Sequence, residues 1–232
     1  MLINYQTKQW VKKNSFEKKF GSINPPLFPN EMLVRLCSSS RFSKIKINIL
    51  RKKFKILEIG CFSGNNLRFF LEKKVHCYGS EINNEMRNLC INNLKKFGYK
   101  NIKINIGDNE NINYGNNYFD LLVSINTIHY SYGKNLEYAV KEYARVIKKG
   151  GILIFETPTP MHTTVKKSKK VGDFHFLWGD KGFRNKNPIG FINNLSKFKR
   201  ILNKYFSKFE INHKVESYNK IKLSTYFFVC KK

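Results

Sequence analysis

The 232-residue chain has no apolar run near the roughly 18 to 20 residues that a membrane-spanning helix requires. Its first ten residues lack the charged start, apolar middle and small-residue cleavage site of a signal peptide. The five cysteines are scattered and none forms a C-x-x-C pair, so the sequence favours neither a zinc site nor a disulfide framework. We therefore expect a cytoplasmic protein with reduced, mostly buried cysteines.

Acidic residues are also scarce, since 16 Asp and Glu stand against 43 Lys and Arg, for a formal net charge of +27. Residues 1–55 hold 13 basic and 2 acidic side chains, residues 56–159 hold 13 and 10, and residues 160–232 hold 17 and 4. The middle is nearly balanced and the flanks are strongly basic. Two interpretations remain open: a surface for a polyanion such as nucleic acid, anionic lipid or glycan, or a compositional drift toward Lys, Asn and Ile.

Hydrophobic patterning predicts strands and helices in alternation through the middle of the chain. The expected strands cover residues 54–59, 75–80, 102–106, 119–125 and 152–156, and the expected helices cover residues 66–73, 83–97 and 136–147. Such alternation implies a parallel sheet with right-handed crossovers, an α/β fold. The tail predicts a helix over 188–205 and strands over 209–218 and 223–229.

The ends of the chain predict a division into parts. Amphipathic spacing predicts a helix over 5–20, and Asn30 is placed to cap a helix over 31–39. We expect residues 1–53 to form an N-terminal helical cap and residues 54–232 the main domain. Within it, residues 157–187 are an irregular, basic and aromatic insert.

The most informative motif is Glu-Ile-Gly-Cys-Phe-Ser-Gly, residues 58–64, between an expected strand and an expected helix. This is the opening of a nucleotide-binding βα unit. A carboxylate at the strand end repels a pyrophosphate, so Glu58 favours an adenosine ligand that has no phosphate and carries positive charge. S-adenosylmethionine, with its ammonium and sulfonium, is such a ligand.

Four further motifs follow in order: Tyr-Gly-Ser-Glu-Ile at 78–82, Ile-Gly-Asp-Asn-Glu at 106–110, the strand and loop 119–129, and Lys-Glu-Tyr-Ala-Arg-Val-Ile-Lys-Lys-Gly-Gly at 141–151. With the first motif, this ordered set resembles the class I S-adenosylmethionine-dependent methyltransferases. The resemblance implies a Rossmann-like domain: a mostly parallel seven-stranded sheet with an antiparallel last strand and helices on both faces. One departure is Phe62, which stands where the family usually has a third glycine.

The resemblance also implies the cofactor site. Glu81 would accept hydrogen bonds from the ribose hydroxyls, Asp108 would accept one from the adenine amine, and Glu58 would oppose the positive end of the cofactor. The expected cofactor-binding residues are Glu58, Gly60, Cys61, Gly64, Glu81, Ile82, Asp108, Asn109, Ile125 and Asn126. We interpret Asp120, Glu142 and Arg145 as structural.

The acceptor side is less defined. His129 follows the fourth strand and is the first choice for a base or an acceptor-orienting group, although a packed histidine is about as consistent with the sequence. Tyr130, His175 and Trp178 are further candidates for contact with the acceptor, and a small packed hairpin is the alternative for the last two. No metal-ligand cluster accompanies them, which disfavours metal-dependent chemistry.

Three functions remain in view. The first is an enzyme that moves a methyl group to an oxygen or nitrogen of a small molecule or glycan precursor, leaving S-adenosylhomocysteine. The second is an RNA methyltransferase that uses the basic flanks. The third, suggested only by Phe62, is a non-catalytic binding domain.

Overall fold

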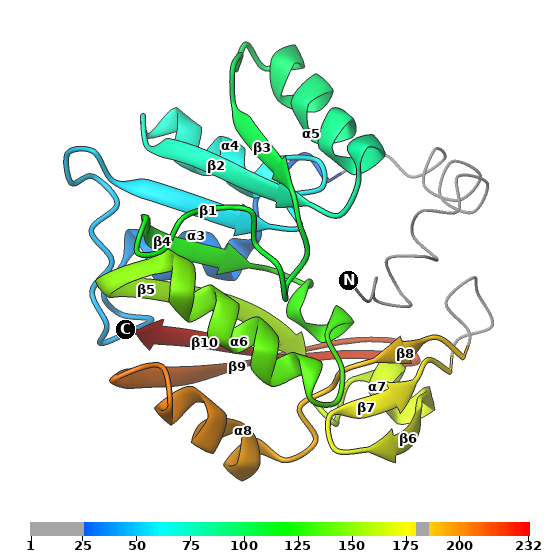
Figure 1. Cartoon of the computed structure of the whole chain (residues 1–232). Helices are drawn as coiled ribbons and strands as arrows, with labels where there is room; N and C mark the ends of the chain where they lie inside the picture. Colours follow the sequence, from blue (N-terminus) through cyan, green and yellow to red (C-terminus); the bar gives the residue numbers. More distant parts are fainter. Residues whose placement is uncertain (1–25, 180–185) are drawn as a thin grey trace.

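The computed structural model describes residues 26–179 and 186–232 (Figure 1). The helix expected over 5–20 lies outside these residues. The main sheet has seven strands in the order β3-β2-β1-β4-β5-β10-β9. Its strands are β1 (Lys55–Ile59), β2 (His76–Glu81), β3 (Lys103–Ile106), β4 (Phe119–Ser124), β5 (Ile147–Pro158), β9 (Lys208–Tyr218) and β10 (Ile221–Lys231). Only β10 runs antiparallel to both of its neighbours, so the expected fold class is confirmed.

Helices cover both faces of this sheet (Figure 1). They are α3 (Glu31–Ser38), α4 (Asn65–Glu72), α5 (Asn84–Lys96), α6 (Asn135–Val146) and α8 (Leu195–Asn203), with a short 3-10 turn η1 (Ile128–Tyr130) after β4. Residues of β1 alternate between the two apolar layers: Leu57 packs with Tyr143 of α6 and Phe198 of α8, whereas Ile56 packs with Leu67 of α4. This alternation is the two-residue period of a strand buried on both sides.

Asparagine side chains begin three of the helices. Asn30 Oδ1 accepts from the Leu33 amide at 3.1 Å, which confirms the expected cap of α3. Asn83 and Asn194 cap α5 and α8 in the same way. Each cap satisfies an amide that has no partner within its helix, so the start of each helix is set locally.

The segment after β5 folds into a small unit of its own. It contains α7 (Thr163–Lys167) and a three-stranded sheet of β6 (Lys169–Gly172), β7 (His175–Leu177) and β8 (Pro188–Ile189). The expectation of a helix from residue 188 was wrong, because β8 pairs with β7 and the helix begins only at its cap, Asn194. Within the described residues, no helix is long and apolar enough to cross a membrane. All five cysteines are buried and free, as expected.

Candidate functional site

A cavity of about 490 Å³ lies at the carboxyl ends of the central strands. In open α/β sheets this edge is where ligands bind. Nine of the ten residues predicted for the cofactor line it: Glu58, Gly60, Cys61, Glu81, Ile82, Asp108, Asn109, Ile125 and Asn126. Loops that follow four different strands therefore meet around one space, as the motif order implies.

The glycine loop after β1 holds three residues at positive φ: Gly60 at 68°, Phe62 at 43° and Gly64 at 73°. A Cβ on Gly60 would stand 2.5 Å from Thr127 Oγ1, so close packing as well as conformation favours glycine there. Gly64 is absent from the cavity lining. A Cβ on it would stand 2.7 Å from Leu94 Cγ, so Gly64 allows α4 to approach α5 closely.

Phe62 takes the left-handed conformation that a glycine would take at this position. Its amide donates a hydrogen bond to Glu81 Oε1 at 2.5 Å, and its side chain forms part of the cavity wall. The departure from the family pattern is thus accommodated without loss of the loop shape.

Two buried carboxyls face the cavity from β1 and β2. Glu58, only 2% exposed, accepts from Asn66 Nδ2 at 2.7 Å through Oε1, while its Oε2 has no hydrogen-bond partner among the described residues. Burial raises its pKa to about 8. Burial also raises the pKa of Glu81 to about 7, against the opposing effect of the Phe62 and Ile82 amides. Both carboxyls would gain from a ligand that brings positive charge or hydroxyl donors.

The loop after β3 supplies Asp108 and Asn109. Asp108 Oδ1 accepts from the Glu110 amide at 2.9 Å, an Asx turn that shapes the loop. The Asn109 side chain donates to the Thr127 carbonyl at 3.1 Å and accepts from the Tyr143 hydroxyl at 2.6 Å. Asn109 therefore joins the loop after β3 to the loop after β4 and fixes that side of the cavity.

The segment before α3 also lines the cavity, through Pro26, Phe28 and Asn30, which sequence reasoning missed. The glycine loop and the start of α4 hold it: Asn65 Nδ2 donates to the Phe28 carbonyl at 2.8 Å, and the Asn30 amide donates to Asn66 Oδ1 at 2.8 Å. In the sequence, only the two consecutive asparagines after the glycine loop indicate that another segment binds there. Their partners lie 36 or 37 positions away, which no local pattern reveals.

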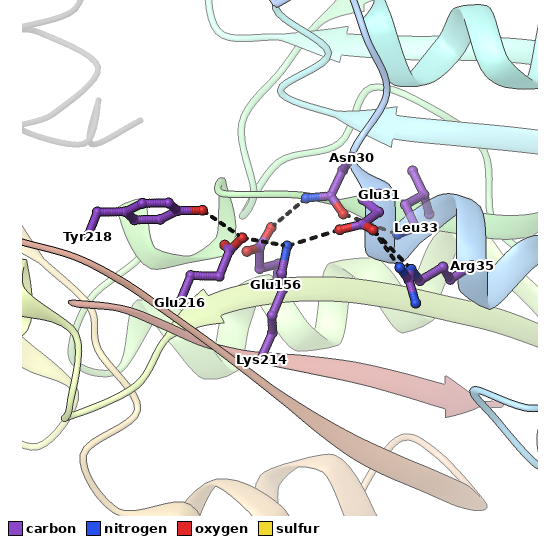
Figure 2. A network of polar contacts seen from close by, with 8 residues as sticks. All are labelled: Asn30, Glu31, Leu33, Arg35, Glu156, Lys214, Glu216 and Tyr218. Carbon is purple, nitrogen blue, oxygen red and sulfur yellow. Dashed lines mark hydrogen bonds and ion pairs between the residues drawn. The ribbon is translucent and has the colours of Figure 1, made fainter. Parts of the chain in front are cut away.

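Polar contacts anchor the same segment to the far strands of the sheet (Figure 2). Asn30 Nδ2 donates to Glu156 Oε2 on β5 at 3.2 Å, and Lys214 on β9 lies 3.3 Å from Glu31 Oε2 and from Glu216 Oε1. Glu156 is 6% exposed, and burial raises its pKa to about 7. The wall formed by residues 26–30 is therefore fixed at both sides.

Of the residues predicted to contact the acceptor, only Tyr130 lines the cavity. His129 is 5% exposed, outside the lining, with its ring 4.8 Å from that of Tyr130 and 6.4 Å from that of Phe191. The η1 turn directs neighbouring side chains to different sides, which sequence position alone does not reveal. The structure therefore places His129 outside the cavity lining and Tyr130, beside it in sequence, within the lining.

His175 and Trp178 also lie outside the cavity lining. Trp178 is 8% exposed and packs in an aromatic cluster with Phe176 and Phe191. The His175 ring lies 4.8 Å from Tyr132, and burial lowers its pKa. The described part of this segment matches the alternative of a packed hairpin.

Two lining residues that were not predicted are Glu110 and Ser131. Burial raises the pKa of Glu110 to about 7; the nearby Ser131 side chain acts in the opposite direction, and the charge of Asp108 adds to the increase. Glu110 directly follows the Gly-Asp-Asn motif, and this position could have indicated that it lines the cavity.

The acids interpreted as structural lie outside the cavity lining. Asp120, 4% exposed, contacts Arg51, accepts from the Lys55 amide at 2.9 Å and lies 3.0 Å from Lys148 Nζ. Glu142 and Arg145 pair at 2.8 Å, and Arg145 also donates to the loop that follows β3. These contacts stabilise the edge opposite to the cavity and the flank of α6.

A family model described as a methyltransferase domain matches residues 57–155. A solved structure of an S-adenosylmethionine-dependent methyltransferase from Methanosarcina mazei is 17% identical, with a TM-score of 0.63 over 80% of this chain and 95% of that one. A protein of Pyrococcus horikoshii is 18% identical, with a TM-score of 0.58 over 78% and 82%. A protein of Bacillus subtilis is 13% identical, with a TM-score of 0.60 over 78% and 93%. A search of curated proteins found no match.

Proposed function

We propose that the chain is a class I S-adenosylmethionine-dependent methyltransferase and that it transfers the methyl group to an oxygen or nitrogen of a small molecule bound in the described cavity. One observation carries this proposal: the buried acids Glu58 and Glu81 line one cavity at the carboxyl edge of the sheet, and Glu58 Oε2 has no hydrogen-bond partner among the described residues. A glycan precursor is one form that such an acceptor would take.

The residues present fit the cofactor. Glu58 Oε2 and Ser80 Oγ are buried in the cavity wall without hydrogen-bond partners among the described residues, so a ligand there would satisfy atoms that the fold leaves unsatisfied. We assign Glu81 to the ribose hydroxyls, Asp108 to the adenine amine and Glu58 to the positively charged end. When bound, S-adenosylmethionine supplies an activated methyl group on a sulfonium.

The chain's own contribution is to orient the acceptor and exclude water. Phe62, Tyr130 and the segment 26–30 form walls of the cavity. The insert contacts the segment that follows Tyr130, since the Phe174 carbonyl accepts from the Gly133 amide at 3.0 Å. We therefore propose residues 157–187 as an element that shapes the acceptor side, and residues 1–53 as an N-terminal helical cap.

The placement of basic residues favours a small acceptor over RNA. Strands β1, β2 and β5 begin at the edge opposite to the cavity, and the antiparallel β10 ends there (Figure 1). Exposed or half-buried lysines gather at this edge: Lys52, Lys53, Lys73, Lys74, Lys148, Lys149, Lys231 and Lys232. Phosphate contacts at that edge would hold an RNA away from the reaction centre.

We also propose that the protein works in the cytoplasm. Its five cysteines are free thiols, which is the usual state in a reducing compartment. Localisation of a fluorescent fusion tests this assignment, and a signal outside the cytoplasm would contradict it.

The function is tested by offering deuterium-labelled S-adenosylmethionine with a library of small molecules and, separately, with total RNA. We expect a labelled methyl group on a small molecule and none on RNA. A gel shift whose affinity falls linearly with the logarithm of salt concentration, together with labelled RNA, would favour the RNA function instead.

A further inference from the structure

The cavity is lined by acidic side chains, although the protein as a whole is strongly basic. The chain carries a net charge of +27, yet the ionisable lining residues other than tyrosine and cysteine are all acids within the described ranges: Glu58, Glu81, Asp108 and Glu110. No lysine, arginine or histidine of those ranges lines the cavity. A cavity of this kind favours cations and repels anions.

The cofactor accounts for only part of this charge. Under the proposed function, Glu58, Glu81 and Asp108 serve the cofactor, which carries one net positive charge. Glu110 remains without an assigned partner of opposite charge. It is half-buried and shares the lining with Tyr130 and Ser131, the residues that follow β4. Partial burial in the cavity wall disfavours the charged form of Glu110, so a cation beside it would stabilise the carboxylate.

The Glu110 carboxyl can take up or release a proton near neutral pH. Burial raises its pKa to about 7, with the Ser131 side chain and Asp108 as its other main influences. Tyr143 lies behind this group, bonded to Asn109 and Ser124, and offers it no positive charge. No cationic side chain is among the causes that set the pKa of Glu110.

We propose that the acceptor is a small amine, protonated in solution, and that Glu110 binds its ammonium group and accepts its proton. This inference rests on the proposed function and narrows it from oxygen or nitrogen to nitrogen. Glu110 is then a catalytic residue, since it contacts the reacting group of the acceptor.

The reaction balances without any further reactant. The Glu110 carboxylate takes one proton from the ammonium, which leaves a neutral amine with a free lone pair. The amine nitrogen forms a bond to the methyl carbon while the carbon–sulfur bond breaks, and the electron pair of that bond stays on sulfur. The positive charge passes from sulfur to the methylated nitrogen, and the protonated Glu110 later releases its proton to water.

The first test uses matched sets of compounds that share a skeleton and differ in one group: phenethylamine, 2-phenylethanol and phenylacetate, and 200 further sets built in the same way. Transfer of labelled methyl from S-adenosylmethionine is measured for every compound. We expect products from amines alone. Transfer mainly to alcohols or carboxylates, or to no amine while S-adenosylhomocysteine still binds, would overturn the inference.

The second test is a binding measurement with variants. Glu110→Gln keeps the size of the side chain and removes its charge, and Glu72→Gln on the exposed surface of α4 is the matched control. Calorimetric titration of the best amine into the S-adenosylhomocysteine complex should show binding that is lost only in Glu110→Gln. Transfer to that amine should fall by roughly 10² to 10⁴ fold, the range for a general base.

Equal amine binding by Glu110→Gln and wild type would overturn the role of Glu110. A purely structural role would weaken the binding of S-adenosylhomocysteine as well, so that affinity is measured in each variant. Failure of the wild type to bind S-adenosylhomocysteine would instead contradict the proposed function, and the two failures are therefore distinguishable.

Discussion

Glu58 provides a test of the electrostatics of the cavity. The pKa of this buried carboxyl is about 8 in the folded protein, against its ordinary value of 4.5. At pH 6 to 8 the folded state therefore binds more protons at Glu58 than the unfolded state does, and stability falls as pH rises. Replacement by Gln removes this titration and keeps an oxygen that accepts from Asn66 Nδ2.

The size of the expected change in the free energy of unfolding follows from the pKa of Glu58. Between pH 6 and pH 8 the unfolded carboxyl is ionised throughout, whereas the folded one becomes half ionised only near pH 8. At 1.36 kcal/mol per pH unit, Glu58 lowers the free energy of unfolding by about 2 kcal/mol over this interval. The acids Glu81, Glu110 and Glu156 act in the same direction, but they are present in both proteins and cancel in the comparison.

The assay is urea unfolding of the ligand-free wild type and of Glu58→Gln at pH 6, 7 and 8. We expect the variant to gain about 2 kcal/mol relative to wild type from pH 6 to pH 8. Glu72→Gln, at an exposed position, should follow the wild type at every pH. Parallel pH profiles for wild type and Glu58→Gln would contradict the raised pKa, because they would mean that Glu58 is ionised and solvated in the folded protein.

Two further variants test the contacts that hold the loops around the cavity. Tyr143→Phe removes the donor to Asn109 Oδ1 and should lower the free energy of unfolding by about 1 to 3 kcal/mol, which urea unfolding measures; an unchanged midpoint would contradict the bond. Gly60→Ala forces a side chain into the left-handed region and against Thr127, and should cost at least about 1 to 2 kcal/mol and weaken cofactor binding. Wild-type stability and affinity in Gly60→Ala would show that the loop has another shape.

The sheet and most of its helices could be predicted from the sequence because their signals are local. The apolar run of β4 and the asparagine cap of α3 are read within a few residues. The glycine loop is also a local signal, and with the motifs that follow β2, β3 and β4 it supplies nine of the expected cofactor residues to one cavity. The start of α8 was misplaced because pairing of Pro188 with β7 overrides helical spacing.

The acceptor side could not be predicted in the same way. His129 and Tyr130 are adjacent in sequence, and only the η1 turn decides that Tyr130 lines the cavity. Trp178 is buried by Phe191, which comes from a segment beyond the insert. The wall at residues 26–30 depends on contacts with α4 that no local pattern encodes. Orientation and long-range contacts are therefore what the structure adds.

The proposed function depends on the binding of S-adenosylmethionine in this cavity through Glu81, the acid at the end of β2. Calorimetric titration with S-adenosylhomocysteine, comparing wild type, Glu81→Gln and the control Glu72→Gln, tests it most directly. We expect binding by wild type and control, and a loss of roughly 10-fold or more in Glu81→Gln, because hydrogen bonds to a charged group are worth about 1.5 to 3 kcal/mol each. Absence of binding by the wild type, or equal affinity in Glu81→Gln, would contradict it.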